Sequence, residues 1–516
     1  MISQSNSCKM TCIWKRLMLF CVLFGDHLMV DCFIGVNWGR SASQNLVPSM
    51  VVDLLLQNDI PNLRIYGPKP SILVAFEGSP TAIAVTIMKD FVMRKKWTNV
   101  KSMDDMLENL IIPPIQRGVN IQTLIIVHEP FTKVRPILWN ITDVFRQTRA
   151  SLDNHNLKYI RTTTSHFTDV ITMTKKPSEA DFRADIKGTM MGLLEIINKT
   201  NSFFTYNIFP ITSVEQYKWP MEFGFMDNKS NFTVVDGAYT YTNAFEFLFD
   251  ALVVALGKAG YPDMEIQIGQ IGWPTDGSKD ATVENAERFY RSFIPHIVKN
   301  RGTPRRRNIS IDVYLNSLGD ENQNIIEYGA YQRHFGIYAY DGAPKFSIDI
   351  SGNGRKVYPT EAKGTVKSPS RWCIFKGDMS NKALVEAQMA AACNMSDCTE
   401  LLPGASCGRI GYADRVSYAF NALYQIQNQE NQAGACDFEG LGALTPIDPS
   451  IGECKYPVGI LTAETVDGGI QLAENVFNYA LNTGISSSAS PALNISLEQL
   501  FFALPMYIIF LVLITK

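Results

Sequence analysis

Carboxylates and amides stand where short apolar runs of the sequence end. Glu129 closes the run TLIIVHE, Gln270 lies within EIQIGQIGW, and Glu321 follows ISIDVYLNSLGD. A carboxyl group in such a place can transfer a proton or attack an electrophilic carbon, whereas a neutral amide can only hydrogen-bond. The amide of Gln270 therefore decides whether the chain is a catalyst or only a binder.

Several further polar or aromatic residues end other apolar runs, namely Asn37, Trp38, Tyr66, His128, Asn207, Phe209, Trp273 and Asp320. Taken singly, each is best explained as a hydrogen-bonded end of a strand. Their recurrence favours a binding cleft, because aromatic faces combined with amides and carboxylates are what recognition of a sugar requires.

The elements that must position these side chains alternate along residues 33–350. Strand-like runs such as CFIGVNW, NLRIY and FFTYNIFP are separated by stretches of helical length, for example Ala244 to Gly260 and Ala281 to Lys299. Apolar strands that alternate with helices predict a parallel sheet covered on both faces. We expect an α/β fold, with a (β/α)8 TIM barrel as the first choice and an open doubly wound sheet as the second.

Composition limits the classes of function. The chain has 516 residues, of which 46% are hydrophobic and 19% charged, which is typical of a globular protein with more than one domain. Its formal net charge of -3 gives no electrostatic argument for a nucleic-acid partner. No glycine-rich phosphate-binding motif follows a strand, so we expect no nucleotide cofactor. The oligomeric state stays open.

The distribution of cysteines divides the chain into a long region without them and a short region that is rich in them. Six of them lie within a short stretch after a long region without any, at Cys373, Cys393, Cys398, Cys407, Cys436 and Cys454. An even number in a short extracellular segment predicts three disulfides in a small domain, residues 371–458. Zinc is the rival interpretation, but no Cys-x-x-Cys pair and no histidine occur between these cysteines, so we expect no metal. Residues 351–370, rich in Gly, Pro, Ser and Lys, are predicted to be a linker.

The two ends carry targeting signals. Lys15 and Arg16 precede the apolar stretch from Leu17 to Phe24, which predicts a signal peptide over residues 1–31. The apolar tail from Leu500 to Ile514 is shorter than the roughly 20 residues of a spanning helix, and small residues lie upstream of it. This order predicts a GPI signal in residues 491–516, preceded by a linker over 459–490. A single membrane-spanning tail is the alternative, and both place the protein outside the cell.

The motifs IGVNWGR, RIYGP, VHEPF, FTYNIFP and IGQIGWPTDG, in this order, resemble plant glycoside hydrolase family 17, the endo-β-1,3-glucanases. The tail motifs WCIFKG, GASC and SYAFNALYQ resemble the callose-binding module of carbohydrate-binding family 43. The resemblance implies a (β/α)8 barrel that acts on or binds β-1,3-glucan, followed by a mainly helical module. It also implies the disulfide pairs Cys373 with Cys436, Cys393 with Cys398, and Cys407 with Cys454.

The resemblance assigns roles to single residues. Glu129 matches the general acid, although the family usually has Asn where this chain has His128, and Gln270 stands where the family has its nucleophilic Glu. Retaining glycosidases need two carboxyl groups, and an amide cannot attack the anomeric carbon, so the covalent route is closed. The residues expected to bind the substrate are Tyr66, Asn207, Phe209, Trp273 and Glu321.

Two further positions depart from the family in the same direction. Asn324 stands where the family has Lys, and Gln332 where it has Glu. We therefore expect a β-1,3-glucan (callose) binding protein with weak or absent hydrolysis, held by a GPI anchor at the outer face of the plasma membrane and in the cell wall. Two alternatives stay open: an active glucan endo-1,3-β-glucosidase that uses another carboxylate such as Glu321, and a non-catalytic wall scaffold.

Overall fold

The computed structural model describes residues 32–88, 100–133, 141–427, 434–461 and 463–464. The predicted signal peptide, the predicted GPI tail and most of the predicted linker before it lie outside these residues. Among the helices that are described, none combines the length and the apolar character needed to cross a bilayer.

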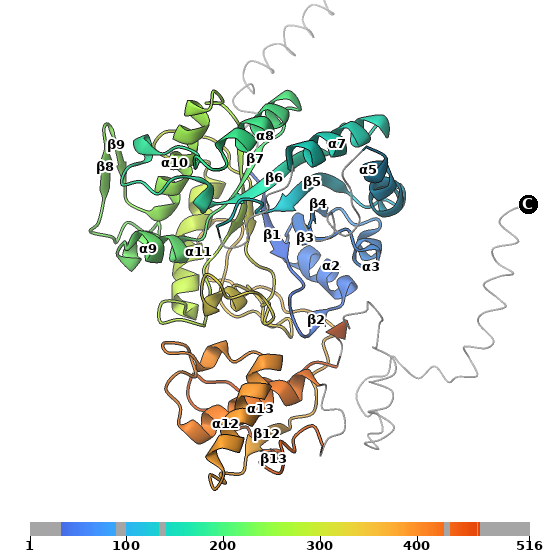
Figure 1. Cartoon of the computed structure of the whole chain (residues 1–516), viewed down its shortest axis with the longest axis vertical. Coiled ribbons are helices and arrows are strands. Elements are labelled where there is room, and N and C mark those ends of the chain that lie inside the picture. The colour runs from blue at the N-terminus through green and yellow to red at the C-terminus, as the bar shows by residue number, and fades with distance from the viewer. Residues whose placement is uncertain (1–31, 89–99, 134–140, 428–433, 462, 465–516) are drawn as a thin grey trace, which may run out of the picture. The chain divides into compact units, whose positions relative to one another are not determined.

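Eight strands form a closed barrel in the order β1-β11-β10-β7-β6-β5-β4-β3, with helices such as α7, α8 and α10 around it (Figure 1). Neighbouring strands in this barrel are parallel throughout. The predicted TIM barrel is confirmed, and the doubly wound alternative is wrong because the sheet closes on itself. The strands are β1 (Ile34–Trp38), β3 (Asn62–Tyr66), β4 (Ala82–Ile87), β5 (Ile121–His128), β6 (Arg161–Phe167), β7 (Phe204–Asn207), β10 (Ile266–Ile271) and β11 (Val313–Leu315).

Helices connect these strands and bury their apolar sides against the barrel. Asn243 and Thr282 cap α10 and α11 by accepting hydrogen bonds from backbone N–H groups of the first turn. The α-helices are α2 (Pro48–Gln57), α3 (Pro70–Leu73), α5 (Val100–Met106), α6 (Ile112–Gln116), α7 (Ile141–Asn154), α8 (Lys187–Lys199), α9 (Pro210–Tyr217), α10 (Ala244–Lys258) and α11 (Val283–Val298).

Short elements complete the connections of the barrel. They are η1 (Val74–Phe76), the π-helical turn η2 (Leu107–Ile111), η3 (Thr168–Val170), η4 (Pro177–Glu179), η5 (Met221–Gly224), η6 (Ala330–Arg333), and the antiparallel hairpin of β8 (Val234–Asp236) and β9 (Tyr239–Tyr241). Strands β1 and β10 are buried along their whole length, so their side chains face either the barrel interior or the helix layer.

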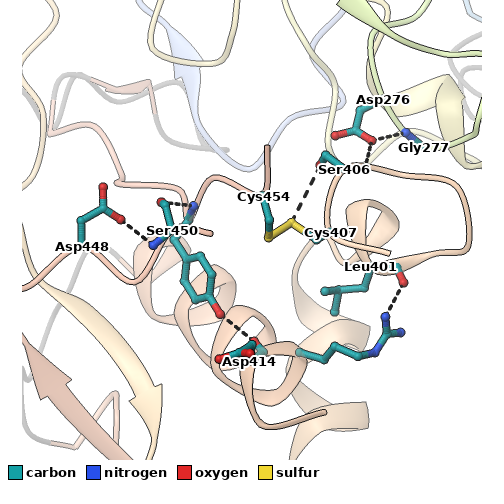
Figure 2. The surroundings of a disulfide bond; sticks show 11 residues. Asp276, Gly277, Leu401, Ser406, Cys407, Asp414, Asp448, Ser450 and Cys454 are labelled. Atoms are coloured by element: carbon teal, nitrogen blue, oxygen red, sulfur yellow. Dashed lines mark hydrogen bonds between the residues drawn. A yellow bond between two sulfur atoms is a disulfide. The ribbon is translucent and has the colours of Figure 1, made fainter. Parts of the chain in front are cut away.

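The cysteine-rich segment forms a separate helical core. It contains β12 (Trp372–Phe375), α12 (Lys382–Met395), η7 (Thr399–Leu401), α13 (Tyr412–Ile426) and β13 (Gly442–Thr445), which pairs with β12 in antiparallel fashion. The three disulfides that the resemblance implied are confirmed, namely Cys373–Cys436, Cys393–Cys398 and Cys407–Cys454. Figure 2 shows the last of these beside Asp414, whose carbonyl accepts a hydrogen bond of 2.6 Å from the Tyr456 hydroxyl.

The two predicted linkers differ from the expectation. Residues 351–370 contain no helix or strand, but Thr360 N donates to Asn58 Oδ1 at 2.7 Å and the side chain of Ala362 is buried. The linker predicted from residue 459 begins too early, because Ile460 is fully buried and β14 (Ala463–Glu464) pairs with β2 (Asn45–Leu46). The buried side chains of Ala362 and Ile460 hold their segments against the rest of the chain, which the loop-like composition did not predict.

Candidate active-site cleft

A chain of side-chain amides joins the ends of four barrel strands. Asn207 Nδ2 donates to Glu129 Oε1 at 2.7 Å and to Gln270 Oε1 at 2.8 Å. Gln270 Nε2 in turn donates to Asn316 Oδ1 at 3.0 Å. Glu129 follows β5, Asn207 ends β7, Gln270 lies in β10 and Asn316 follows β11. The structure thus brings Glu129 and Gln270 together on opposite sides of one shared donor.

Irregular backbone sets the directions in which the Glu129 and Gln270 side chains point. The pairing of β5 with β6 shifts register between Ile125 and His128, and that of β10 with β7 shifts between Ile268 and Gln270. Val127 and Glu129 have φ angles of 64° and 46°, in the left-handed region that β-branched residues such as Val rarely adopt. Bulges and strained backbone of this kind redirect side chains and cluster at functional sites.

Arg64 occupies the barrel interior and fixes the state of His128. The side chain of Arg64 is fully buried, and its guanidinium donates to Gly269 O at 3.0 Å and to Ser165 Oγ at 3.1 Å. Its Nη2 also lies 3.2 Å from His128 Nδ1. Because a guanidinium only donates, Nδ1 must accept, and the ring proton lies on Nε2, 3.9 Å from Glu129 Oε2. Burial and the Arg64 charge hold the pKa of His128 well below its ordinary value, so the ring is neutral.

Glycine at two positions makes this packing possible. A Cβ on Gly269 would lie 2.4 Å from Thr205 Cγ2 and 2.6 Å from Asn207 Oδ1. A Cβ on Gly39 would lie 1.9 Å from Glu321 Oε1. A side chain at either position would therefore displace the amide chain or the Glu321 carboxyl.

Two carboxyl groups of the cleft have pKa values near neutrality. Burial raises the pKa of Glu129 to about 7, against the opposing hydrogen bond from Asn207. Burial likewise raises the pKa of Glu321 to about 7, against the hydrogen bond of 3.0 Å that its Oε1 accepts from Ser41 N. A carboxyl group that is still protonated in a large fraction of molecules at neutral pH suits the role of a general acid.

Glu129, Gln270, Glu321 and Phe209 line one cavity of about 110 Å³. Its walls are the ends of β5, β6, β7, β10 and β11, and Phe167, Phe209 and Phe335 give it aromatic faces. The remaining side comes from the loop after β11, which contributes Asn324, Ile325, Tyr328 and Gln332.

Three predicted substrate-binding residues do not line this cavity. The expectation that Trp273 binds substrate is wrong, because its ring is fully buried, stacks on Phe225 at 4.3 Å and donates from Nε1 to Asp280 O. Tyr66 and Asn207 support the cleft from behind: the Tyr66 hydroxyl donates to Asn37 Oδ1 at 3.0 Å, and Asn207 is fully buried. Trp273 follows β10 and packs among apolar side chains, which favours burial of its ring in the core.

Sequence reasoning missed three residues of the site. Arg64 left a signal, because a single cation inside the apolar strand NLRIY must find buried partners. Asn316 follows β11 at a strand end, as the predicted residues do. Tyr328 left no signal, because its position depends on the path of a long loop.

One group of described residues has the composition of a metal site. His334, Asp397 and Glu400 place one potential ligand atom each within 4.8 Å of one another. However, Asp397 already forms an ion pair of 2.9 Å with Arg333, and His334 Nε2 lies 2.7 Å from Thr399 Oγ1. We assign no metal to this group.

Comparisons with known proteins agree with this geometry. The sequence profile of "Glycosyl hydrolases family 17" matches residues 34–350, and that of the "X8 domain" matches residues 371–443. The chain is 33% identical to "Glucan endo-1,3-beta-glucosidase 8" of Arabidopsis thaliana over 455 residues, which are 86% of this chain and 92% of the relative. It is 32% identical to "Glucan endo-1,3-beta-glucosidase 5" of the same plant, covering 87% of this chain and 93% of that protein.

The fold is also similar to solved structures. A β-1,3-glucanase and allergen of Cryptomeria japonica pollen superposes with a TM-score of 0.58 at 27% identity, covering 62% of this chain and 99% of that protein. A plant β-glucan endohydrolase superposes with a TM-score of 0.55 at 24% identity, covering 61% of this chain and 99% of that protein, a likeness of fold alone.

Proposed function

Because the chain belongs to glycosyl hydrolases family 17 and carries an X8 domain, we propose that it binds β-1,3-glucan at the cell surface and hydrolyses this polymer weakly or not at all. The names of the Arabidopsis relatives support the substrate class, since both are glucan endo-1,3-beta-glucosidases.

The observation that carries this proposal is the environment of Gln270. A retaining glycosidase places its nucleophile roughly 5–5.5 Å from the acid, and the amide of Gln270 shares the donor Asn207 with Glu129. An amide at this place forms no glycosyl ester and supplies no negative charge to an oxocarbenium-like transition state. Glu129, with a pKa of about 7, still carries its proton in a large fraction of molecules at neutral pH but has no nucleophile beside it with which to cleave a glycosidic bond.

Glu321 supports the second candidate, an active glucanase. It lines the same cavity as Glu129, and its pKa of about 7 leaves a large ionised fraction at neutral pH. In this alternative, Glu321 in its ionised form activates a water while Glu129 protonates the leaving oxygen. Glu321→Gln would then abolish hydrolysis, whereas the binding proposal predicts no change in an activity that is already near zero.

The disulfide-rich module and the two ends of the chain support a proposal for where the protein is located. Three disulfides in the X8-containing segment agree with an oxidising compartment outside the cell. We place the protein at the outer face of the plasma membrane and in the wall, held by a GPI anchor. Phosphatidylinositol-specific phospholipase C should release the protein from membranes, and retention after this treatment would favour a spanning tail.

Co-sedimentation tests the proposed function. The secreted chain without its hydrophobic tail should sediment with insoluble β-1,3-glucan and stay in solution with cellulose. Glu129→Gln removes the acid but keeps the hydrogen-bonding shape, so this variant should bind to the same extent. A protein that binds neither polymer would instead fit the scaffold alternative.

A further inference from the structure

We propose that residues 322–333, here named the cover loop, close the barrel cleft over Gln270, and that Tyr328 is the specificity-determining residue that excludes the interior of a glucan chain from the barrel. This proposal rests on the proposed function, because it assigns retention of the polymer to the module. It concerns which part of a glucan can enter the cleft, and through which residue.

Tyr328 carries the cover loop across the mouth of the barrel. The loop follows β11, yet the hydroxyl groups of Tyr328 and Thr132 are hydrogen-bonded, and Thr132 lies in the loop after β5. In the barrel, β10, β7 and β6 separate β11 from β5. The Tyr328 ring also packs on Phe167 at the end of β6, with 4.9 Å between ring centroids. The contact therefore spans the strand ends that hold Gln270 and Asn207.

Thr132, the partner of Tyr328 in this contact, is itself held in place. Asp169, in η3 after β6, accepts a hydrogen bond of 2.7 Å from Lys133 N through Oδ2. The same carboxylate oxygen accepts from Thr132 Oγ1 at 3.4 Å. Thr132 thus presents its hydroxyl to Tyr328 from a braced turn.

The cover loop is braced internally by the neutral side chains that depart from the family pattern. Gln332 Oε1 accepts from Tyr328 N at 2.9 Å. The Asn324 side chain accepts from Ile325 N at 2.9 Å, and the backbone carbonyl of Asn324 accepts from Arg333 Nε at 2.9 Å. The amides at 324 and 332, which stand where the family has Lys and Glu, therefore shape the loop.

Two further contacts fix the loop to the barrel. Lys345 Nζ binds both oxygens of Asp320, just before the loop, at 2.6 and 2.7 Å. The Tyr331 hydroxyl lies 3.0 Å from Thr212 Oγ1 in α9. Contacts therefore hold the residue just before the loop, the middle of the loop at Tyr328 and its end at Tyr331.

The space beneath the loop is too small for a polymer. The cavity of about 110 Å³ lies below the roughly 300–1,000 Å³ of pockets that enclose small-molecule ligands. A cleft that cuts within a chain must be open on two sides, so that sugars on both sides of the cut can leave it. With Tyr328 on Thr132, the interior of a glucan cannot lie across the strand ends.

The number of glucan-binding sites per molecule tests whether the cover loop closes the cleft. Calorimetric titration of the secreted chain with laminarihexaose should give one site per molecule for the unmodified protein. Tyr328→Ala, alone and with Ile325→Ala, should add a second site of independent affinity. Tyr328→Phe keeps the ring on Phe167 and loses the hydroxyl contact, so it should add a smaller fraction of this site. Tyr159→Ala is the matched control, because Tyr159 is exposed and precedes β6 at the opposite end of the barrel.

Hydrogen exchange locates the added site and verifies the fold of each variant. Peptides that cover 204–209 and 266–271 should gain protection with laminarihexaose in Tyr328→Ala and show no change in the unmodified protein. Two sites in the unmodified protein, or an affinity that falls in Tyr328→Ala without a new site, would overturn the proposal and make Tyr328 a sugar platform. Loss of binding to insoluble glucan by the unmodified protein would contradict the proposed function instead.

Discussion

Gln270 Nε2 donates a hydrogen bond of 3.0 Å to Asn316 Oδ1. The Gln270 amide satisfies this acceptor while its oxygen accepts from Asn207. A carboxylate in the same place has no proton for Asn316, which would have to turn its own NH2 group toward it. The hydrogen bonds around residue 270 therefore match the amide that the sequence contains.

Gln270→Glu should create hydrolysis of a small substrate that does not need to cross the cleft. We expect release of nitrophenol from a nitrophenyl β-laminaribioside to rise at least about tenfold, which corresponds to about 1.4 kcal/mol of activation free energy. Gln270→Ala is the control, because it removes the amide without adding a nucleophile. An equal rise in both variants would show that the carboxylate is not the cause.

Opening the cover loop should matter for the polymer and not for the small substrate. In the Gln270→Glu background, adding Tyr328→Ala should raise the rate on laminarin several-fold and leave the rate on the nitrophenyl substrate within about twofold. Reducing-sugar and nitrophenol assays on the same preparations measure the two rates. A proportional change on both substrates would place the effect of Tyr328 in catalysis and not in access.

The buried carboxyl groups should make the barrel more stable in acid than at neutral pH. The pKa values of Glu129 and Glu321 are raised from ordinary values near 4.5 to about 7. The folded state then binds more protons than the unfolded state between these values, so stability falls as pH rises from about 4.5 through 7. Each group accounts for at most about 3 kcal/mol of this loss.

Urea unfolding of the barrel between pH 5 and pH 8 measures this dependence. Glu321→Gln replaces the ionisable group with a neutral amide of the same shape, so its stability should change less over this range. A pH dependence that stays the same in Glu321→Gln would contradict a raised pKa for this residue.

The disulfides of the module should contribute unequally. Cys373–Cys436 joins residues 63 apart in the sequence, whereas Cys393–Cys398 joins residues only 5 apart. Loop-closure entropy predicts losses of about 4 and about 2 kcal/mol when these bonds are removed. Paired Cys→Ser variants, compared by chemical unfolding of the module, measure the difference. A larger loss for the shorter loop would show that contacts around Cys393 outweigh chain entropy.

Much of the fold followed from the sequence because its signals are local. Apolar strands that alternate with helices predicted the barrel, and the order of motifs predicted the module with its disulfides. The register shifts near Ile125 and Ile268 were not predictable, since a bulge depends on pairing between strands that are distant in the chain. The directions in which the Glu129 and Gln270 side chains point depend on these bulges.

Side-chain burial determines which of the expected residues line the cavity and which do not. Trp273 follows the same strand as Gln270, yet packing against Phe225 gives it a place in the core. Tyr328 lies in the loop after the predicted strand end at Asp320 and reaches the cleft through a contact with Thr132. The spacing of residues in the sequence does not predict either position, because each depends on which apolar surface lies nearest in the folded chain.

The rate at which the unmodified protein hydrolyses laminarin, compared with that of Glu129→Gln, tests the central claim most directly. The two proteins should release reducing sugar at the same rate, near that of a blank, because the proposed function has Gln270 in the place of the nucleophile. Both should still sediment with insoluble β-1,3-glucan. Strong hydrolysis by the unmodified protein that is lost in Glu129→Gln would contradict the account and identify an active glucanase that uses another carboxylate.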